Sequence, residues 1–376
     1  MKFKILKERL KEIVYTVERI CSKKGDLNIL NFFQIKANNN KIFVSATDLE
    51  ISYQAEIFGK IEQEGEVLLP SKQFVQLLDS FYEDELTLEK NGNSVRIKGD
   101  NSVSNLVGLI EEEYPVISAV EKNKYFEVDS GIFEDSLNKV FSNLRTADLF
   151  KPELSGVYFI LTKKDLTLVT TDTLRLSETK IKSQFYTSNI DDTKILIPKK
   201  IIQEYLAIKR KPTKLSIFFE EHQISFDLGS QVLITKLMSA EFPDYKRIIP
   251  EEFNLSIHIE KDSILKILKL NKVFLDQTKE VRFKINPTQK QAEIYSKNEL
   301  LGETTNNLKI NIIENVLREN EIFEIGFNHE FFQDGILAVE GEKIFLGFNQ
   351  SNGETSKPLV IKSPIEEDFI YILMPL

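Results

Sequence analysis

Apolar and polar residues follow two patterns along the chain, and both patterns recur at similar spacing. Three stretches each begin with a short alternation of apolar and polar residues, which predicts a strand, and continue with apolar residues at helical spacing. These stretches are MKFKILKERLKEIVYTVERI, KYFEVDSGIFEDSLNKVFSNL and LSIHIEKDSILKILKLNKVFL. The recurrence predicts three similar units in one chain.

Further markers occur in the same order in the first two units. ATDLEIS (Ala46 to Ser52) matches TTDTLRLS (Thr170 to Ser177), and VLLPSKQFVQLL (Val67 to Leu78) matches ILIPKKIIQEYL (Ile195 to Leu206). EEEYPVI then matches SAEFPDY. The third unit carries a weaker copy, in which EIGFNHEFFQDGILAV (Glu324 to Val339) replaces the Pro-containing marker and AEIYSKNEL replaces Thr-Asp.

Each unit combines two helices with several strands. Within a unit the pattern reads strand, helix, several strands, strand, helix, several strands, which is a doubled arrangement of helix and sheet. We therefore predict an α+β fold that is rich in strands. The predicted domains span residues 1–121, 122–250 and 251–376.

The repeated Thr-Asp pair raises the question of catalysis. Asp48 and Asp172 each follow one alternating run and precede another, a position where Asp commonly makes a turn. A catalytic Asp would need a convergent base, nucleophile or metal site. We interpret both residues as structural corners, and the alternative of a hydrolase that uses them would require metal-dependent turnover.

Other signatures of catalysis are missing from the sequence. His222, His258 and His329 lie far apart and form neither HxH nor HExxH. The sequence has no GxxxxGK[ST], no GxGxxG after a strand and no GxSxG. We therefore predict no metal, no cofactor and no enzymatic activity.

Composition narrows the class of protein further. The 376 residues are 41% hydrophobic, which is ample for packed cores, and they carry a formal net charge of −9 at pH 7. The one cysteine, Cys21, cannot form an internal disulfide, and the N-terminal segment lacks the apolar core of a signal peptide. No apolar run approaches the roughly 18 to 20 residues of a membrane helix. We expect a cytoplasmic protein without a membrane role.

Positive charge gathers on helices of the repeated units although the chain is acidic. The first helix and the helix in PKKIIQEYLAIKRKP (Pro198 to Pro212) both carry Lys and Arg opposite an apolar stripe. One such helix would usually be a solvated face, but repetition suggests a shared basic surface that attracts phosphate. The candidate phosphate contacts are Lys11, Arg19, Lys23, Lys24, Lys72, Lys151, Lys199, Lys200, Arg210 and Lys211.

Together the markers resemble the bacterial sliding clamp family, the β subunit of DNA polymerase III. The most specific pieces are ATDLEI, LSGVYF (Leu154 to Phe159), TTDTLRLS, EFPDYKRIIP (Glu241 to Pro250) and the ending LMPL, and the match runs from MKFKI to YILMPL. The resemblance implies a non-catalytic DNA sliding clamp with three similar domains per chain. It further implies a head-to-tail homodimer that closes a ring, with helices inside and sheets outside, around double-stranded DNA.

The resemblance also implies binding sites. Lys24, Lys72, Lys199 and Lys200 fall at family positions that face the DNA. A pocket would receive short peptides of the replicative DNA polymerase, the clamp loader and repair proteins. Its matching positions are Leu154, Thr171, Leu174, Arg175, Leu176, Pro243, Arg247, Ile248, Ile372, Met374, Pro375 and Leu376. Because the C-terminus can converge only on the second Thr-Asp corner, we expect no pocket at the first.

Two departures from the family concern this pocket. Thr173-Leu174 stands where the family commonly has Gly-His, and the chain stops at Leu376, where many relatives continue. One pocket wall is therefore more apolar, and we expect the peptide preference to differ.

The subunit contact is expected to join an edge of the first domain to an edge of the third, since an unpaired strand edge invites pairing with another chain. The first edge lies around SVSNLVGL (Ser102 to Leu109), and the second around ILKILKLNKVFL (Ile264 to Leu275). The candidate interface residues are Phe74, Leu77, Leu106 and Leu268. A repeat scaffold that binds only proteins is the alternative, and it would not stay on circular DNA or slide off linear ends.

Overall fold

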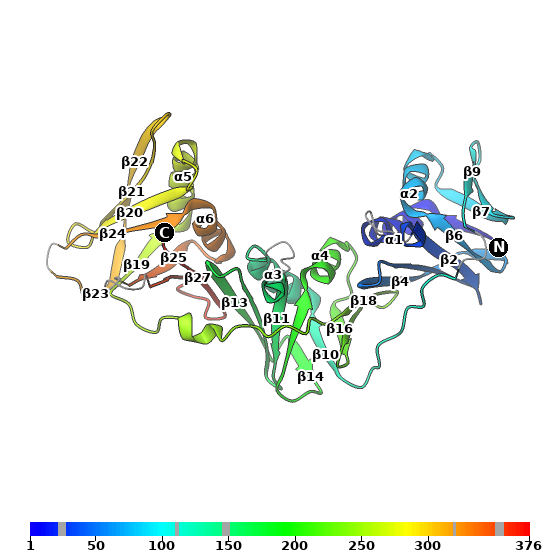
Figure 1. The fold of residues 1–376 in the computed structure, drawn as a ribbon, viewed down its shortest axis with the longest axis horizontal. Helices are drawn as coiled ribbons and strands as arrows, with labels where there is room; N and C mark the ends of the chain where they lie inside the picture. Colours follow the sequence, from blue (N-terminus) through cyan, green and yellow to red (C-terminus); the bar gives the residue numbers. More distant parts are fainter. Residues whose placement is uncertain (22–27, 110–112, 145–150, 319–320, 350–356) are drawn as a thin grey trace. The chain divides into compact units, whose positions relative to one another are not determined.

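Strand pairing between segments far apart in the sequence organises the chain. A computed structural model describes residues 1–21, 28–109, 113–144, 151–318, 321–349 and 357–376 (Figure 1). Unit 1 contains Met1–Gly131, Phe185–Asp191 and Ile197–Met238, and unit 2 contains Ile132–Gln184, Asp192–Leu196 and Ser239–Leu376. The division between the units runs through the second predicted domain, whose strands belong to two different sheets.

Each of the three predicted strand–helix starts is present. The helices are α1 (Lys7–Ile20), α2 (Ser71–Ser80), α3 (Ser130–Phe141), α4 (Lys199–Ala207), α5 (Lys261–Asn271) and α6 (His329–Ala338). Strands β1, β10 and β19 end at the residue before α1, α3 and α5 begin. In α1 the buried residues recur at helical spacing, among them Leu10, Val14 and Val17. The α+β prediction is confirmed.

Unit 1 contains two sheets. The five-stranded sheet has the order β5 (Lys60–Gln63), β1 (Lys2–Leu6), β7 (Glu85–Asn91), β8 (Ser94–Lys98) and β9 (Val103–Val107). The nine-stranded sheet has the order β14 (Tyr186–Ser188), β10 (Tyr125–Asp129), β16 (Lys214–Phe219), β17 (Gln223–Asp227), β18 (Gln231–Lys236), β4 (Ile51–Phe58), β3 (Lys41–Thr47), β2 (Phe32–Asn38) and β6 (Gly65–Pro70). Figure 1 shows α1, α2 and α4 on one face of the nine-stranded sheet.

Unit 2 has the same organisation. Its nine-stranded sheet has the order β15 (Thr193–Pro198), β11 (Gly156–Leu161), β12 (Asp165–Thr171), β13 (Arg175–Lys182), β27 (Phe369–Leu373), β26 (Leu359–Lys362), β25 (Lys343–Phe348), β19 (Leu255–Glu260) and β23 (Asn311–Asn315). The four-stranded sheet has the order β22 (Gly302–Lys309), β21 (Gln291–Asn298), β20 (Glu280–Asn286) and β24 (Phe323–Asn328).

Both nine-stranded sheets are a five-stranded block joined to a four-stranded block. The join in unit 1 is the antiparallel pair β18 and β4, and the join in unit 2 is the antiparallel pair β27 and β13. Thr235 lies opposite Ile51 in the first join, and Leu373 lies opposite Arg175 in the second. The two smaller sheets are one further five-stranded block, with β9 at its edge, and one further four-stranded block, with β22 at its edge.

A buried histidine connects two helices of unit 2. His329 begins α6, has none of its surface exposed, and donates from Nε2 to the backbone oxygen of Leu268 in α5 at 2.8 Å. The carbonyl can only accept, so Nε2 carries the proton. Burial lowers the pKa of His329 below its ordinary value of 6.5, because the charged ring would lose its hydration.

This histidine should make folding depend on pH. Above pH 6.5 the ring is neutral in both states, but below it the unfolded chain binds a proton that the folded chain excludes. The stabilisation is therefore present above the unfolded pKa and lost as pH falls, by at most about 1.4 kcal/mol per pH unit. We expect His329→Gln to weaken the fall in the thermal unfolding midpoint between neutral and mildly acidic pH. The exposed His222→Gln is the control, and equal slopes for both variants would contradict this account.

Candidate functional site

The two Thr-Asp corners have the same hydrogen bonds. In each corner the Thr hydroxyl donates to the backbone oxygen four residues on. Asp48 Oδ1 accepts from the backbone nitrogens two and three residues on at 3.1 and 2.8 Å, and Asp172 Oδ1 accepts from the equivalent nitrogens at 3.0 Å each. Leu49 and Thr173 have left-handed φ values of 74° and 76°. This geometry confirms the interpretation of both aspartates as corners.

The corners differ in what the other carboxylate oxygen contacts. Asp48 Oδ2 pairs with Lys200 of α4, whereas Asp172 Oδ2 accepts from Arg175 Nε at 2.9 Å. The position equivalent to Arg175 is Ile51 in the first corner. Only the second corner therefore places a guanidinium in the turn.

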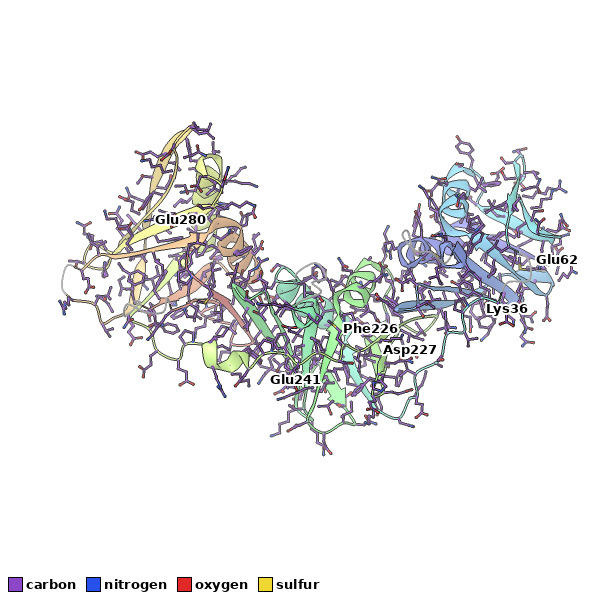
Figure 2. The ribbon with its side chains drawn as sticks, viewed as in Figure 1. Lys36, Glu62, Phe226, Asp227, Glu241 and Glu280 are labelled. Carbon is purple, nitrogen blue, oxygen red and sulfur yellow. The ribbon has the colours of Figure 1, made fainter. Side chains whose placement is uncertain are left out.

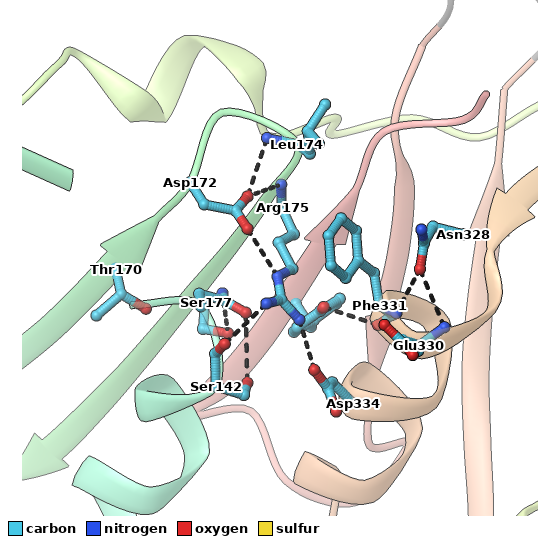
Figure 3. A network of polar contacts seen from close by, with 12 residues as sticks. Ser142, Thr170, Asp172, Leu174, Arg175, Ser177, Asn328, Glu330, Phe331 and Asp334 are labelled. Carbon is cyan, nitrogen blue, oxygen red and sulfur yellow. Dashed lines mark hydrogen bonds and ion pairs between the residues drawn. The ribbon is translucent and has the colours of Figure 1, made fainter. Parts of the chain in front are cut away.

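Arg175 is the centre of a polar network in unit 2 (Figure 3). Besides Asp172, its guanidinium donates to Asp334 at 2.5 Å and to the backbone oxygen of Ser142 at 2.8 Å. It also lies 4.0 Å from the centroid of the Phe331 ring, within range of a cation–π interaction. The Arg175 side chain is 10% exposed. It thus connects the corner with the segment after α3 and with α6.

Sequence reasoning did not find Phe331 and Asp334. Both lie in EIGFNHEFFQDGILAV, whose sequence indicates only a weak copy of a marker. Their spacing of three residues places them on one face of α6, which was the available signal. No pattern in the sequence indicates that this face meets Arg175, more than 150 residues earlier.

The structure brings part of the predicted pocket together around Arg175. Leu176 lies opposite Ile372 across the β13–β27 join, and the backbone nitrogen of Met374 donates to the oxygen of Leu174 at 2.8 Å. Leu176 and Ile372 are buried and form a small cluster with Tyr245 of the linker helix η3 (Tyr245–Ile248). The packing of these buried residues holds the strands and the linker helix of the site together.

Three aliphatic residues of the predicted set are exposed, namely Leu174, Ile248 and Leu376, with 45%, 45% and 63% of their surface exposed. Arg247 is exposed and pairs with Asp244 at 2.6 Å, next to the exposed Pro243.

The remaining predicted positions are less accessible. Leu154 is buried in the 3-10 helix η2 (Pro152–Ser155), and Thr171 is buried at the end of β12. Pro375 is half-buried beside a cavity of about 600 Å³, which Leu376 and Arg282 also line. The backbone nitrogen of Leu376 donates to the oxygen of Gly326 at 3.0 Å, so the C-terminal tail lies against β24.

Four of the ten candidate phosphate contacts pair with carboxylates of described residues. Lys11 pairs with Asp79 at 2.8 Å, Arg19 with Glu204 at 2.7 Å and Arg210 with Glu12 at 2.9 Å, and Lys200 pairs with Asp48. The basic helix faces are therefore partly neutralised within unit 1.

The other cations differ in exposure. Lys211 folds back onto the end of α4, where its Nζ donates to the oxygen of Ile208 at 2.6 Å. Lys199 is half-buried, and burial lowers its pKa. Lys72 and Lys151 are exposed, and Lys72 has no ion pair with a described residue. Lys23 and Lys24 lie outside the described residues.

Two of the predicted interface residues do not reach the surface. Phe74 and Leu268 have no exposed surface, because the apolar faces of α2 and α5 pack inward, and the Phe74 ring lies 5.3 Å from that of Phe33. Leu77 and Leu106 are half-buried, and Leu106 lies on the edge strand β9. Phe74 and Leu268 are therefore core residues, and their prediction as interface contacts is wrong.

The described residues hold no group of three His, Cys, Asp or Glu side chains that could bind a metal. Both corner carboxylates are already occupied by backbone N–H groups and a cation, which argues against the hydrolase alternative. In the same part of the chain, no helix has the length and apolar character to cross a membrane.

Comparison with known proteins covers the whole chain. Three family models match in order: the N-terminal domain of the DNA polymerase III beta subunit at residues 1–118, its central domain at 128–244 and its C-terminal domain at 246–376. The beta sliding clamp of Chlamydia muridarum is 24% identical over 354 residues, which are 93% of each chain.

Solved structures share the fold. The DNA polymerase III beta subunit of Thermotoga maritima has a TM-score of 0.89 at 24% identity, and the DNA polymerase sliding clamp of Bacillus subtilis has a TM-score of 0.90 at 22% identity. Each match covers 100% of this chain and 99% of the other.

The fold and the three ordered matches define a DNA sliding clamp, a non-catalytic protein of DNA replication. The chain belongs to the DNA polymerase III beta subunit family. The expectations of a sliding clamp and of a protein without enzymatic activity agree with this family, and the protein-only scaffold is not supported.

The two corners should contribute differently to stability. Asp172→Ala removes two backbone hydrogen bonds and one of the carboxylates around the buried Arg175, and we expect a loss of about 3 kcal/mol. Asp48→Ala removes the same backbone bonds and a more exposed ion pair, and we expect a loss of about 1 to 2 kcal/mol. Denaturant midpoints measure both, with the exposed Asp192→Ala as the control. Equal losses at the two corners would show that Arg175 does not depend on Asp172.

Proposed function

We propose that two copies of this chain pair head to tail through β9 and β22 and close a ring around double-stranded DNA. The observation that carries the proposal is the pair of edges left over after the two joins within the chain. One five-stranded block ends at β9, in the place that β18 and β27 hold in the joined five-stranded blocks. One four-stranded block ends at β22, in the place that β4 and β13 hold in the joined four-stranded blocks. A third join of the same kind would pair β9 of one chain with β22 of another.

The side chains at both edges support pairing with a second copy. On β9, Val103 and Val107 are 49% and 62% exposed. Beside β22, Leu300 and Leu301 in the preceding turn are 94% and 64% exposed. An exposed apolar edge strand is a template for association, and covering it removes apolar surface from water. A head-to-tail contact of this type closes into a ring when its rotation fits, and we infer from the family resemblance that two chains suffice.

The ion pairs on α1 and α4 fit a ring that holds DNA by topology. Each carboxylate beside a candidate cation reduces its attraction for phosphate, so contact with DNA is weak and independent of sequence. Strong attraction would hinder sliding, whereas a closed ring stays on DNA without it.

The C-terminal tail and the second corner form the proposed partner site. Leu174, Ile248 and Leu376 offer exposed apolar surface, and Arg175 fixes the turn that carries Leu174. Such surface suits an extended peptide with aliphatic and aromatic anchors. We infer that the replicative polymerase, the clamp loader and repair proteins bind here, in the cytoplasm at replication forks.

The ring can be tested with one variant at each edge. Val107→Asp and Leu301→Asp each place a charge in both interfaces of a homodimer, so each variant alone should be a monomer in sedimentation velocity. An equal mixture retains one intact interface, between the unaltered β22 of one variant and the unaltered β9 of the other. We expect heterodimers in the mixture that are not retained on nicked circular DNA.

Both positions are exposed in the single chain, so the variants should keep the wild-type circular dichroism spectrum. Leu268→Asp would not serve, because it would place a charge in the core. Homodimers of either single variant, or an absence of heterodimers in the mixture, would reject pairing of β9 with β22.

The contribution of single cations to DNA binding is measurable from its dependence on salt. Lys72→Gln removes a cation that has no described carboxylate partner, so the slope of log affinity against log salt should decrease by about 0.9. Reversing Lys199 and Lys200 to Glu should also reduce the slope. Lys36→Gln is the control, because β2 directs Lys36 away from the helices (Figure 2). Anisotropy of a short labelled duplex gives the slopes, and an unchanged slope for Lys72→Gln would place it away from DNA.

The partner site depends on the C-terminal tail. Deleting Met374 to Leu376 removes the backbone contacts to Leu174 and Gly326 and the exposed Leu376 side chain. Binding of a labelled polymerase tail peptide should fall at least tenfold in anisotropy, while the dimer and its retention on circular DNA stay unchanged. Peptide binding at full strength after the deletion would show that the site lies elsewhere.

A further inference from the structure

The first Thr-Asp corner, expected to have no pocket, borders a cavity of about 210 Å³ in unit 1. Its walls come from the corner, from the linker after β9 and from the end of β18. The lining residues include Thr47, Glu50, Pro115, Val116, Ile234 and Lys236. The cavity therefore lies where the five-stranded block of one repeat joins the four-stranded block of another.

This cavity occupies the position of the proposed partner site in the other join. The strand register makes Thr235 equivalent to Leu373, so Ile234 corresponds to Ile372 and Lys236 to Met374. The repeat equates Thr47 with Thr171, and Pro115 with Pro243. Four residues that line the cavity thus stand at pocket positions of the second corner.

We propose that this cavity is a second peptide-binding site, which takes an extended segment with one aliphatic side chain between a basic and an acidic residue. The proposal rests on the proposed function of the second corner, whose occupant has the same backbone form. At about 210 Å³ the cavity is smaller than the roughly 300 Å³ at which pockets for drug-sized ligands begin, so it suits a single anchor side chain.

Charge and apolar surface specify the occupant. Val116 is 92% exposed and Leu49 is 48% exposed, and both border the cavity. Glu50 and Lys236, both exposed, replace Leu174 and Met374 of the other site, so the rim carries one charge of each sign. A peptide with Lys on one side of its anchor and Asp on the other matches this rim.

The linker that lines the cavity leaves room for an extended peptide beside it. Residues 113–120 belong to no helix and no sheet, so their backbone is not committed to a ladder. The Tyr114 hydroxyl accepts from the Thr47 backbone nitrogen at 3.0 Å and donates to the oxygen of Phe32 at 3.2 Å. The linker is thereby held against the corner, and a peptide strand can bind beside it without prior rearrangement.

The test uses the peptide Ac-SKLDSG-NH2 and its partner Ac-SKGDSG-NH2, which lacks the aliphatic anchor. Saturation-transfer NMR with the full chain should show the leucine methyl groups in contact with protein, and the glycine peptide should bind at least fivefold more weakly. Val116→Asp should reduce binding of the leucine peptide at least fivefold. Leu49→Asp should do the same, and Asp tolerates the left-handed φ of this position.

Deletion of Met374 to Leu376 separates the two sites. The leucine peptide should still bind the shortened chain, whereas the polymerase tail peptide should not. Loss of the leucine peptide on deletion, or equal binding by the Val116→Asp variant and the wild type, would overturn the second site and leave the first intact. A polymerase tail peptide that ignores the deletion would instead reject the proposed function of the second corner.

Discussion

Backbone pairing across the two joins, β18 with β4 and β27 with β13, is the interaction on which the rest of the fold depends. Each join turns two blocks into one nine-stranded sheet, and the helices of that unit pack on the sheet. The Thr-Asp corners lie at the ends of the joined strands β4 and β13, so the joins also place the linkers and the chain terminus beside the corners. A strand edge thus determines both the architecture and the position of the candidate sites.

The two corners differ in chemistry at one equivalent position, which is Ile51 in the first corner and Arg175 in the second. Ile51 carries no charge, and Asp48 pairs with Lys200. Arg175 pairs with Asp172 and also contacts Asp334 and Phe331 (Figure 3). A guanidinium offers donors in several directions, so it can connect three segments where an aliphatic side chain connects none. The backbone turn is the same in both corners, and the difference lies in which parts of the chain are held around it.

Local features of this structure were predictable from sequence, and long-range ones were not. The turn at Asp48 and Asp172 involves residues two to four positions apart, so its pattern is visible in the sequence. The burial of Phe74 and Leu268 was missed, because helical spacing identifies an apolar face but not whether that face meets its own sheet or a second chain. The pairs Lys200–Asp48 and Arg19–Glu204 were missed because 152 and 185 positions separate their partners.

The likeness between the joins has a consequence for how such assemblies can be divided into polypeptides. If a join within the chain and a join between chains use equivalent strands, the ring requires a fixed number of repeats. It does not require the breaks between polypeptides to fall at particular joins. Three chains of two repeats, or one chain of six, would make the same strand pairings as two chains of three. The covalent link then sets how readily the ring opens, because only a join without a linker beside it can separate completely.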